Sequence, residues 1–407
     1  MEPVKIADSV YWVGAVDFSI RDFHGYRTSE GSTYNAYLLV DKKITLVDTV
    51  KKEFLPEMLS RISKIVDPQK IDQVVANHAE LDHSGALPGL MELIGRAKPV
   101  YTSPMGEKIL KAHFRESGLN YQAVKSGDSL SLGRLSLDFL ETRMVHWPDS
   151  MFSLCPQLGL LFSQDAFGLH LATNRRFDDE VSRVVWGYEA LKYFANILTP
   201  YTGLIAALLK KVTDSGLASK IKVICPDHGL IWRANPAEIM GCYSRWVKQE
   251  PTRKAVVVYD TMWNSTEKMA TELVDALSGE GVLVRQMNLK TCHRSDIVTE
   301  IYTAGAVLVG SPTLNNDLYP TVAELLNYMR GLKFQNKVGG AFGSYGWSGE
   351  AAELLQAALA GMKFQLPAPE VRFQWVPAEA DLEPVRALGR TVAGVLPREP
   401  VSAGFNL

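Results

Sequence analysis

The segment NHAELDHSG, residues 77–85, places four side chains that can bind a metal ion within six positions: His78, Glu80, Asp82 and His83. It continues from IDQVVANH (71–78), an apolar run typical of a buried strand, and turn residues follow it. We therefore expect a loop at a strand end, where rigid scaffolds hold reactive groups. If the loop stays extended, His78, Glu80 and Asp82 point in similar directions, and His83 turns with the loop.

Three further candidate ligands stand at the ends of other predicted strands: His146, Asp165 and His228. One metal ion needs three or four protein ligands, so these seven residues predict two ions with one bridging carboxylate. Three carboxylates and four imidazoles without a cysteine suit iron or manganese, and a pair of zinc ions stays possible. The remaining histidines are interpreted as surface or hydrogen-bonded core residues: His24, His113, His170 and His293.

The 407 residues exceed one average core, so length alone predicts two or three domains. Residues 1–250 mix short strands, such as the alternating SLSLGRLSLDF (129–139), with helical patterns that include one long helical region over 185–212. This mixture predicts stacked sheets with helices outside. Strands and helices then alternate over 254–397, which predicts a doubly wound parallel sheet. The strands are expected at 254–260, 281–289, 305–311, 337–346 and 370–377, and the helices at 265–279, 321–332, 348–362 and 381–396.

The first strand of this second half runs into a loop of small polar residues, in VVVYDTMWNSTEKMA (256–270). The backbone N–H groups of the helix that follows can hold a phosphate. Neither GxGxxG nor GxxxxGK is present, and a Ser/Thr loop without a cation suits the terminal monophosphate of FMN. An ordinary capped helix is the alternative.

Two more strand ends, in GSPTLNNDLYP (310–320) and FGSYGWSGE (342–350), converge on the same crevice of such a sheet. Glycine permits close backbone approach there, and Trp263, Tyr345 and Trp347 offer aromatic faces to a planar ring. The predicted flavin-binding residues are Thr261, Met262, Trp263, Asn264, Ser265, Thr266, Pro312, Thr313, Leu314, Asn315, Ser344, Tyr345, Gly346, Trp347, Ser348 and Gly349.

The pattern HxExDH over 78–83 resembles the metal-binding motif of the metallo-β-lactamase-like fold, an αββα sandwich. Hydrolases of that fold typically carry HxHxDH. Glu80 replaces an imidazole with a harder oxygen ligand, which favours iron over zinc. Glu80 in this position resembles the flavodiiron proteins (A-type flavoproteins), and residues 254–397 are similar to their flavodoxin-like part, with YDTMWNST and GSYGWSGE as the most specific segments.

This resemblance implies a reductase that converts O2 to water or NO to N2O at a non-haem diiron site, with electrons passing through FMN. It implies that His78, Glu80 and His146 hold one iron, that Asp82, His83 and His228 hold the other, and that Asp165 bridges them. The position of His83 is not always a ligand in the family. The resemblance also places His24 and Tyr26 at the border of the pocket, with Tyr26 as a hydrogen-bond donor beyond the ligands or simply a packed aromatic.

The same resemblance implies a head-to-tail homodimer, or a dimer of such dimers. The chain ends at Leu407 without a CxxC module, so we expect electrons from a separate carrier, rubredoxin or in some members a deazaflavin. Two alternatives stay open: a binuclear hydrolase with a regulatory flavodoxin domain, and an electron carrier with a structural metal site. Glu80 counts against the first, and seven ligands at loop ends count against the second.

The overall composition limits the cysteine chemistry, the partners and the compartment that we expect. The cysteines Cys155, Cys225, Cys242 and Cys292 form no CxxC pair, which argues against a disulfide framework or an iron–sulfur cluster, and we interpret Cys155 and Cys225 as buried structural residues. A net charge of −2 without a basic stripe argues against nucleic acid as a partner. No signal peptide or membrane span is evident, so the cytoplasm is the expected compartment and no membrane partner is expected.

Overall fold

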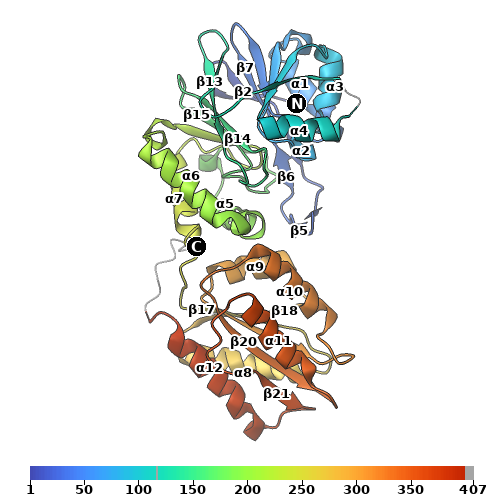
Figure 1. Ribbon diagram of the computed structural model, residues 1–407, viewed down its shortest axis with the longest axis vertical. Helices are drawn as coiled ribbons and strands as arrows, with labels where there is room; N and C mark the ends of the chain where they lie inside the picture. The colour runs from blue at the N-terminus through green and yellow to red at the C-terminus, as the bar shows by residue number, and fades with distance from the viewer. Residues whose placement is uncertain (116–117, 399–407) are drawn as a thin grey trace. The chain divides into compact units, whose positions relative to one another are not determined.

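The computed structural model describes residues 1–115 and 118–398, which group into two compact units (Figure 1). The N-terminal unit comprises Met1–Phe23, Thr28–Tyr193 and Tyr201–Ser244. The C-terminal unit comprises the chain from Arg245 onward together with two short segments, His24–Arg27 and Phe194–Pro200. The domain bounds 1–250 and 254–397 stay a prediction, since these two segments of the first range group with the second unit.

Two sheets form the centre of the N-terminal unit. The first has the order β1 (Val4–Ala7), β2 (Val10–Trp12), β7 (Tyr37–Val40), β8 (Ile44–Val47), β9 (Gln73–Ala76), β10 (Pro99–Thr102) and β11 (Asn120–Ala123). The second has the order β12 (Ser129–Ser131), β13 (Ser136–Glu141), β14 (Met151–Cys155), β15 (Leu160–Gln164) and β16 (Val223–Pro226). Short strands accompany them: β3 (Ala15–Asp17), β4 (Asp22–Phe23), β5 (Tyr26–Arg27) and β6 (Ser32–Tyr34).

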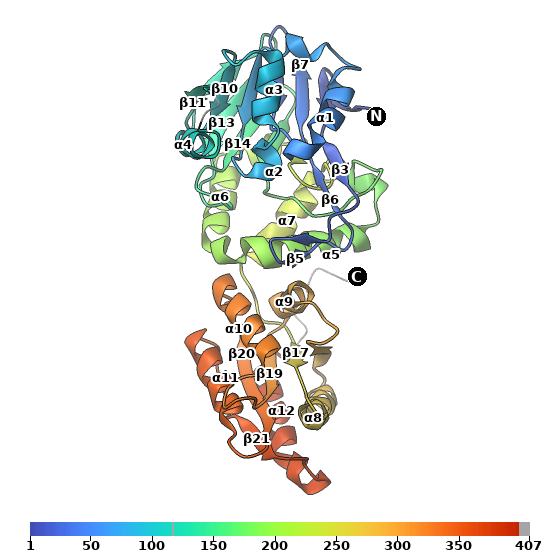
Figure 2. The ribbon, with the colours of Figure 1, turned by 90° about the vertical axis from the view of Figure 1, so that its right-hand side faces the viewer.

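The two sheets pack face to face, because their strands alternate apolar side chains toward a shared core. Tyr37 of the first sheet meets Phe162 of the second, with ring centroids 5.2 Å apart. The outer face of the first sheet is covered by α1 (Leu55–Ile62), α3 (Leu87–Ile94) and α4 (Pro104–His113). Beside the second sheet, Tyr243 of α7 (Pro236–Trp246) accepts a hydrogen bond at 2.7 Å from the Phe167 N–H, just after β15. This αββα arrangement confirms the predicted stacked sheets (Figure 2).

The long helical region expected over 185–212 is present, and it changes helix type along its length. It consists of α5 (Arg183–Tyr193), the π-helix η4 (Phe194–Leu198), the 3-10 turn η5 (Thr199–Tyr201) and α6 (Thr202–Asp214). Pro200 has no N–H to donate, and the Thr199 hydroxyl donates to the Ala195 carbonyl at 2.7 Å. Other short turns are η1 (Lys52–Phe54), η2 (Pro68–Lys70), η3 (Asp178–Glu180) and η6 (Ala218–Lys220).

The C-terminal unit is a parallel sheet in the order β18 (Leu283–Asn288), β17 (Lys254–Tyr259), β19 (Ala306–Pro312), β20 (Val338–Tyr345) and β21 (Val371–Gln374). This is the flavodoxin-like strand order, and it confirms the predicted doubly wound sheet. α8 (Ser265–Gly279) and α12 (Glu383–Val395), which follows η7 (Glu379–Leu382), share one core with β17, β19 and β20. The remaining helices are α9 (Arg294–Thr303), α10 (Pro320–Leu332) and α11 (Glu350–Gly361).

One helix of this unit, α9, was not predicted. Its sequence RSDIVTEIYT is rich in β-branched residues, which favour strands and obscure a helical pattern. The His293 side chain accepts a hydrogen bond from the Ser295 N–H at 3.3 Å and so caps the helix, which gives this histidine the structural role expected for it.

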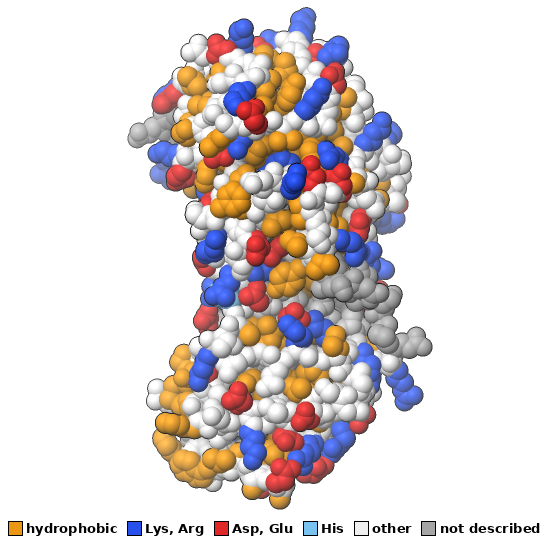
Figure 3. All heavy atoms as spheres, turned by 180° about the vertical axis from the view of Figure 1, so that it is seen from behind, with side chains coloured by type: hydrophobic (Ala, Val, Ile, Leu, Met, Phe, Trp, Pro, Cys, Tyr) orange, Lys and Arg blue, Asp and Glu red, His pale blue; other side chains and the backbone are white. Residues whose placement is uncertain are grey.

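Acidic and basic side chains are interspersed over the face drawn in Figure 3, in keeping with the small net charge of −2. Among the described residues, none of the helices combines the length and the apolar character that crossing a membrane requires.

Candidate metal centre and flavin site

The loop after β9 carries four of the predicted ligands, and its backbone determines how they divide. The chain is extended through Glu80, which is the N-cap of the short helix α2 (Leu81–Ser84). The expectation that Asp82 points with His78 and Glu80 is therefore wrong, because the helical turn redirects it. The far end is fixed by Thr49, whose N–H and hydroxyl donate to the His83 carbonyl at 2.9 and 2.5 Å.

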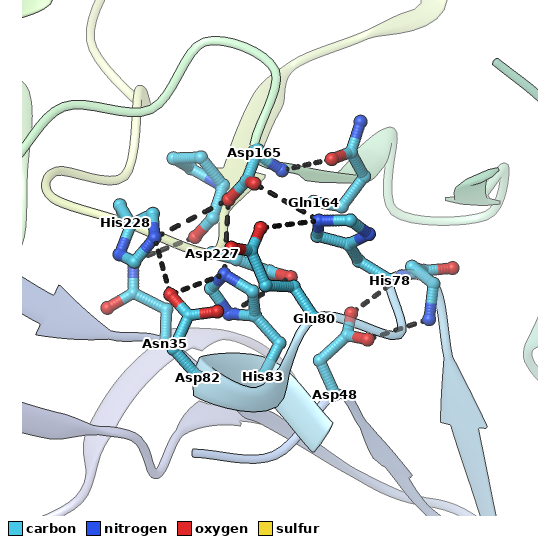
Figure 4. A network of polar contacts seen from close by, with 12 residues as sticks. Asn35, Asp48, His78, Glu80, Asp82, His83, Gln164, Asp165, Asp227 and His228 are labelled. Atoms are coloured by element: carbon cyan, nitrogen blue, oxygen red, sulfur yellow. Dashed lines mark hydrogen bonds and ion pairs between the residues drawn. The ribbon is translucent and has the colours of Figure 1, made fainter. Parts of the chain in front are cut away.

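The structure brings all seven predicted ligands into two adjacent groups. Figure 4 labels all of them except His146. Within each group, the candidate ligand atoms lie within 4.8 Å of one another. The first group is His78, Glu80, His146 and Asp165, and the second is Asp82, His83 and His228.

Asp165 lies between these groups. Its Oδ2 atom is 2.7 Å from His146 Nε2 and 3.3 Å from His78 Nε2. Its Oδ1 atom is 3.1 Å from His83 Nε2 and 3.5 Å from His228 Nε2. Each carboxylate oxygen therefore faces the histidines of a different group, which is the geometry that a bridging ligand requires.

The electrostatics of the cluster favour positive charge at its centre. Burial lowers the pKa of His78, but hydrogen bonds to Asp149, Asp165 and Glu80 outweigh it and raise that pKa well above its ordinary value. Burial raises the pKa of Asp165, yet the charge of His83 and hydrogen bonds to three histidines hold it well below the usual range. The pKa of Asp82 is also well below its usual range. Burial raises it, but the charge of His83 and hydrogen bonds to His228 and His83 outweigh that effect. Metal cations supply such charge, so the donor set fits two metal ions.

In three of the histidines, Nε2 faces the cluster and Nδ1 faces away from it. These Nδ1 atoms lie near groups that were not predicted from the sequence. His78 Nδ1 lies 3.1 Å from Asp149 Oδ2, and His228 Nδ1 lies 2.6 Å from the Thr33 carbonyl. His83 Nδ1 lies 3.6 Å from Asp227 Oδ2. Both aspartates were visible as sequence neighbours of ligands, since Asp149 follows His146 by three residues and Asp227 directly precedes His228.

His170 is buried in the core, as expected for a lone histidine, but it also lies against the cluster. Its Nδ1 is 2.8 Å from the Ser32 hydroxyl, and its ring centroid is 4.6 Å from that of His228. Burial and the charge of His228 lower the pKa of His170 well below its ordinary value. Trp147 packs edge-on against His78, at 5.3 Å between ring centroids.

A cavity of about 520 Å³ lies at the carboxyl ends of the strands in the C-terminal unit. Twelve of the predicted flavin-binding residues line it: Met262, Trp263, Ser265, Pro312, Thr313, Leu314, Asn315, Ser344, Tyr345, Gly346, Trp347 and Ser348. Asn316, Trp375 and Val376 line it as well and were missed. Asn316 directly follows the predicted Asn315, while Trp375 and Val376 follow the edge strand β21, whose end carries no motif. Thr261, Asn264, Thr266 and Gly349 are not among its lining residues.

The start of α8 beside this cavity has the features of a phosphate cradle. Asn264 is its N-cap with φ of 66°, and its side chain makes no capping hydrogen bond. The Thr261 hydroxyl is buried and bonds to none of the described residues. The Thr266 hydroxyl is buried 2.9 Å from that of Ser344, which ties the helix start to β20. These donors fit the monophosphate of FMN.

Comparison with known proteins agrees with this architecture. Residues 33–229 match the family model described as ODP family beta lactamase, and residues 257–389 match the flavodoxin model. The nitric oxide reductase of Moorella thermoacetica is 48% identical, over 96% of this chain and 98% of that protein. The solved rubredoxin oxygen:oxidoreductase of Desulfovibrio gigas superposes with a TM-score of 0.94 at 44% identity, over 96% of this chain and 98% of that one.

The flavodiiron protein of Giardia intestinalis superposes with a TM-score of 0.92 at 34% identity, over 97% of this chain and 96% of that one. This chain belongs to the flavodiiron protein family. A flavodiiron protein is an oxidoreductase that uses FMN and a diiron centre, and the residues described above fit both groups. Cys155 and Cys225 of this flavodiiron protein are buried, in agreement with their predicted structural role.

Proposed function

We propose that this flavodiiron protein reduces O2 to water or NO to N2O at a diiron centre held by the seven clustered residues. His78, Glu80 and His146 would hold one iron, Asp82, His83 and His228 the other, and Asp165 would bridge them. The observation that carries this proposal is the orientation of Asp165, whose two oxygens face the histidines of different groups. Two adjacent metals suit substrates with two reacting atoms or two reacting molecules.

The electron count fits the two cofactors together. When bound, FMN supplies two electrons and each iron supplies one, which is the number that converts O2 and four protons into two water molecules. The protein residues hold these groups and limit access of water. Trp147 packs against His78, and His170 packs against His228, so aromatic rings flank the ligands of both groups.

FMN is proposed to lie in the C-terminal cavity, held by the sixteen residues predicted from the three strand-end loops, with its phosphate at the start of α8. Three of them that do not line the cavity, Thr261, Asn264 and Thr266, stand at that helix start. Trp375 and Val376 would add a wall at the end of β21. We assign the diiron function to residues 1–250 and the flavin function to residues 254–397.

The proposed electron donor is rubredoxin, supported by the name of the Desulfovibrio gigas relative. We further propose a head-to-tail homodimer, since close electron transfer needs the flavin near a diiron centre, and the cytoplasm as the compartment. Tyr26, which is buried, is proposed to donate a hydrogen bond near the substrate. A Tyr26→Phe variant should then keep its iron and FMN but turn over more slowly.

The test is anaerobic turnover of the purified full-length protein with chemically reduced rubredoxin, after iron and flavin analysis. We expect two irons and one FMN per chain and consumption of O2, NO or both under matched conditions. Comparing the two gases decides which substrate is preferred. Zinc in place of iron, with neither gas consumed, would contradict the proposal and favour the hydrolase alternative.

A further inference from the structure

The histidines of the cluster differ in how firmly their outer nitrogens are held. A ligand histidine binds metal through one ring nitrogen, and the partner of the other nitrogen fixes the ring orientation and tautomer. In His78, Nδ1 is 3.1 Å from Asp149 Oδ2, and the same oxygen accepts the Ala79 N–H at 2.6 Å. In His228, Nδ1 donates to the Thr33 carbonyl at 2.6 Å. Both rings are therefore anchored by short contacts.

His83 is held differently. Its Nε2 faces Asp82 and Asp165, at 3.2 and 3.1 Å, while its Nδ1 faces Asp227 Oδ2 at 3.6 Å (Figure 4). That last separation exceeds a hydrogen bond. Asp227 is fully buried, and neither of its carboxylate oxygens receives a hydrogen bond from a described residue.

The neighbouring buried carboxylate of Asp48 has the hydrogen-bond donors that Asp227 lacks. Asp48, also buried, accepts hydrogen bonds from the Asn77 N–H at 2.7 Å and from its side-chain amide at 2.9 Å. Burying a carboxylate without hydrogen-bond donors is energetically unfavourable. A hydrogen bond from a donor that comes within reach would therefore stabilise Asp227. His83 Nδ1, 3.6 Å from Asp227 Oδ2, is such a donor.

We propose that Asp227 is the positioning residue of His83, and that the Asp82–His83–His228 position is the weaker of the two metal positions. This inference rests on the diiron centre proposed above. When His83 Nε2 gives its lone pair to the metal, Nδ1 carries the proton and can close onto Asp227. The anchor of His83 is looser than those of His78 and His228. A less firmly oriented ligand lowers the metal affinity of its position.

The experiment measures iron loss from the full-length protein loaded with ⁵⁷Fe, using a ferrous chelator and Mössbauer spectra to distinguish the two sites. The wild type should lose iron in two phases. Asp227→Ala should accelerate only the fast phase, by about 10- to 100-fold. Asp227→Asn should accelerate the fast phase less, because its amide oxygen still accepts a hydrogen bond from His83 Nδ1. Asp149→Asn should instead accelerate the slow phase.

Asp48→Asn is the matched control, because it removes a carboxylate from the same buried region but leaves the His83–Asp227 pair in place. An unchanged circular dichroism spectrum and thermal unfolding transition show that the N-terminal unit of each variant is folded, because FMN would report only on the C-terminal unit. A crystal structure of the wild type after the fast phase provides a measurement without any variant, and it should retain iron at His78, Glu80 and His146.

Equal loss rates in the wild type and Asp227→Ala would overturn the role of Asp227. Iron retained instead at Asp82, His83 and His228 would overturn the order of affinities. Either result leaves the proposed function intact if the wild type holds two irons and consumes gas. A wild type that never binds two irons would overturn the proposed function and this inference together.

Discussion

The Asp165 Oδ2 atom lies 2.7 Å from His146 Nε2, while the other oxygen of the same carboxylate faces His83 at 3.1 Å. One short side chain at the end of β15 thus contacts both groups of candidate ligands, which come from loops distant in the sequence. Removing it should affect both metal positions, whereas removing an outer ligand should affect one.

Asp165→Ala should therefore reduce iron binding at both positions, leaving well under half of the wild-type iron, while FMN binding stays unchanged. The cause is the loss of a shared anionic ligand together with repulsion between two unbridged cations. Iron and flavin analysis of the purified variant measures both quantities. Asp17→Ala is the control, because Asp17 is a buried carboxylate of the same unit that bonds Ser19 and Tyr34. Full iron occupancy in Asp165→Ala would refute the bridge.

Glu80 tests the relation between ligand type and metal identity. Its Oε2 atom lies 3.3 Å from His78 Nε2 and 3.5 Å from His146 Nε2, so it belongs to the first group. Glu80→His replaces a hard oxygen with an imidazole, and we expect the zinc-to-iron ratio to rise when both metals are offered at equal concentration. Metal analysis after refolding or expression in mixed metal measures this ratio. An unchanged ratio would mean that the rest of the site selects iron.

Thr266→Val tests the proposed phosphate cradle. The Thr266 hydroxyl is buried against Ser344, and its loss should weaken FMN binding by about 1 kcal/mol, roughly fivefold in Kd, with iron content unchanged. Fluorescence titration of the flavin-free protein measures the affinity. Thr271→Val is a matched control on the same helix, because Thr271 is exposed and bonds only the Glu267 carbonyl. Equal Kd values of the two variants for FMN would mean that the phosphate does not bind at the start of α8.

The sequence predicted those parts of the site in which several chemistry-bearing residues stand at a strand end. The cluster 78–83 and the three flavin loops have this property, because parallel strands bring their carboxyl ends to one edge of a sheet. The same local logic failed for Asp82. Its direction depends on the turn of α2 that starts after Glu80, and nothing in the segment before the turn residues marks that change.

The missed residues act through tertiary packing. Trp375 lines the cavity because β21 pairs beside β20, and neither strand encodes that pairing on its own. Asp149, Asp227 and Thr33 contact ligand histidines across the unit. The two aspartates stand near ligands in the sequence, but the histidine that each one faces depends on the fold. His170 was assigned correctly to the core, but its contact with His228 depends on the three-dimensional fold alone.

Lys337 provides a test of pH dependence away from both sites. Its ammonium group is buried and donates to the carbonyls of Tyr302 and Ala304 at 2.9 and 2.5 Å. Burial, and secondarily the charge of Lys254, lowers the pKa of Lys337 from 10.5 to about 7. A lysine pKa below its unfolded value means that the folded state binds fewer protons between about pH 7 and 10.5. The contribution of Lys337 therefore destabilises the fold below pH 7 and becomes less unfavourable as the pH rises.

Lys337→Met removes this titration. The free energy of unfolding of the wild type should rise relative to that of the variant between pH 7 and 10, by about 2–5 kcal/mol, because the penalty for charging the buried amine disappears. Guanidinium denaturation of both full-length proteins at several pH values, followed by the transition of the C-terminal unit, measures the difference. Tyrosine and cysteine titrations are common to both proteins and cancel. Parallel pH profiles would mean that Lys337 stays charged in the folded protein, held by its two carbonyl partners.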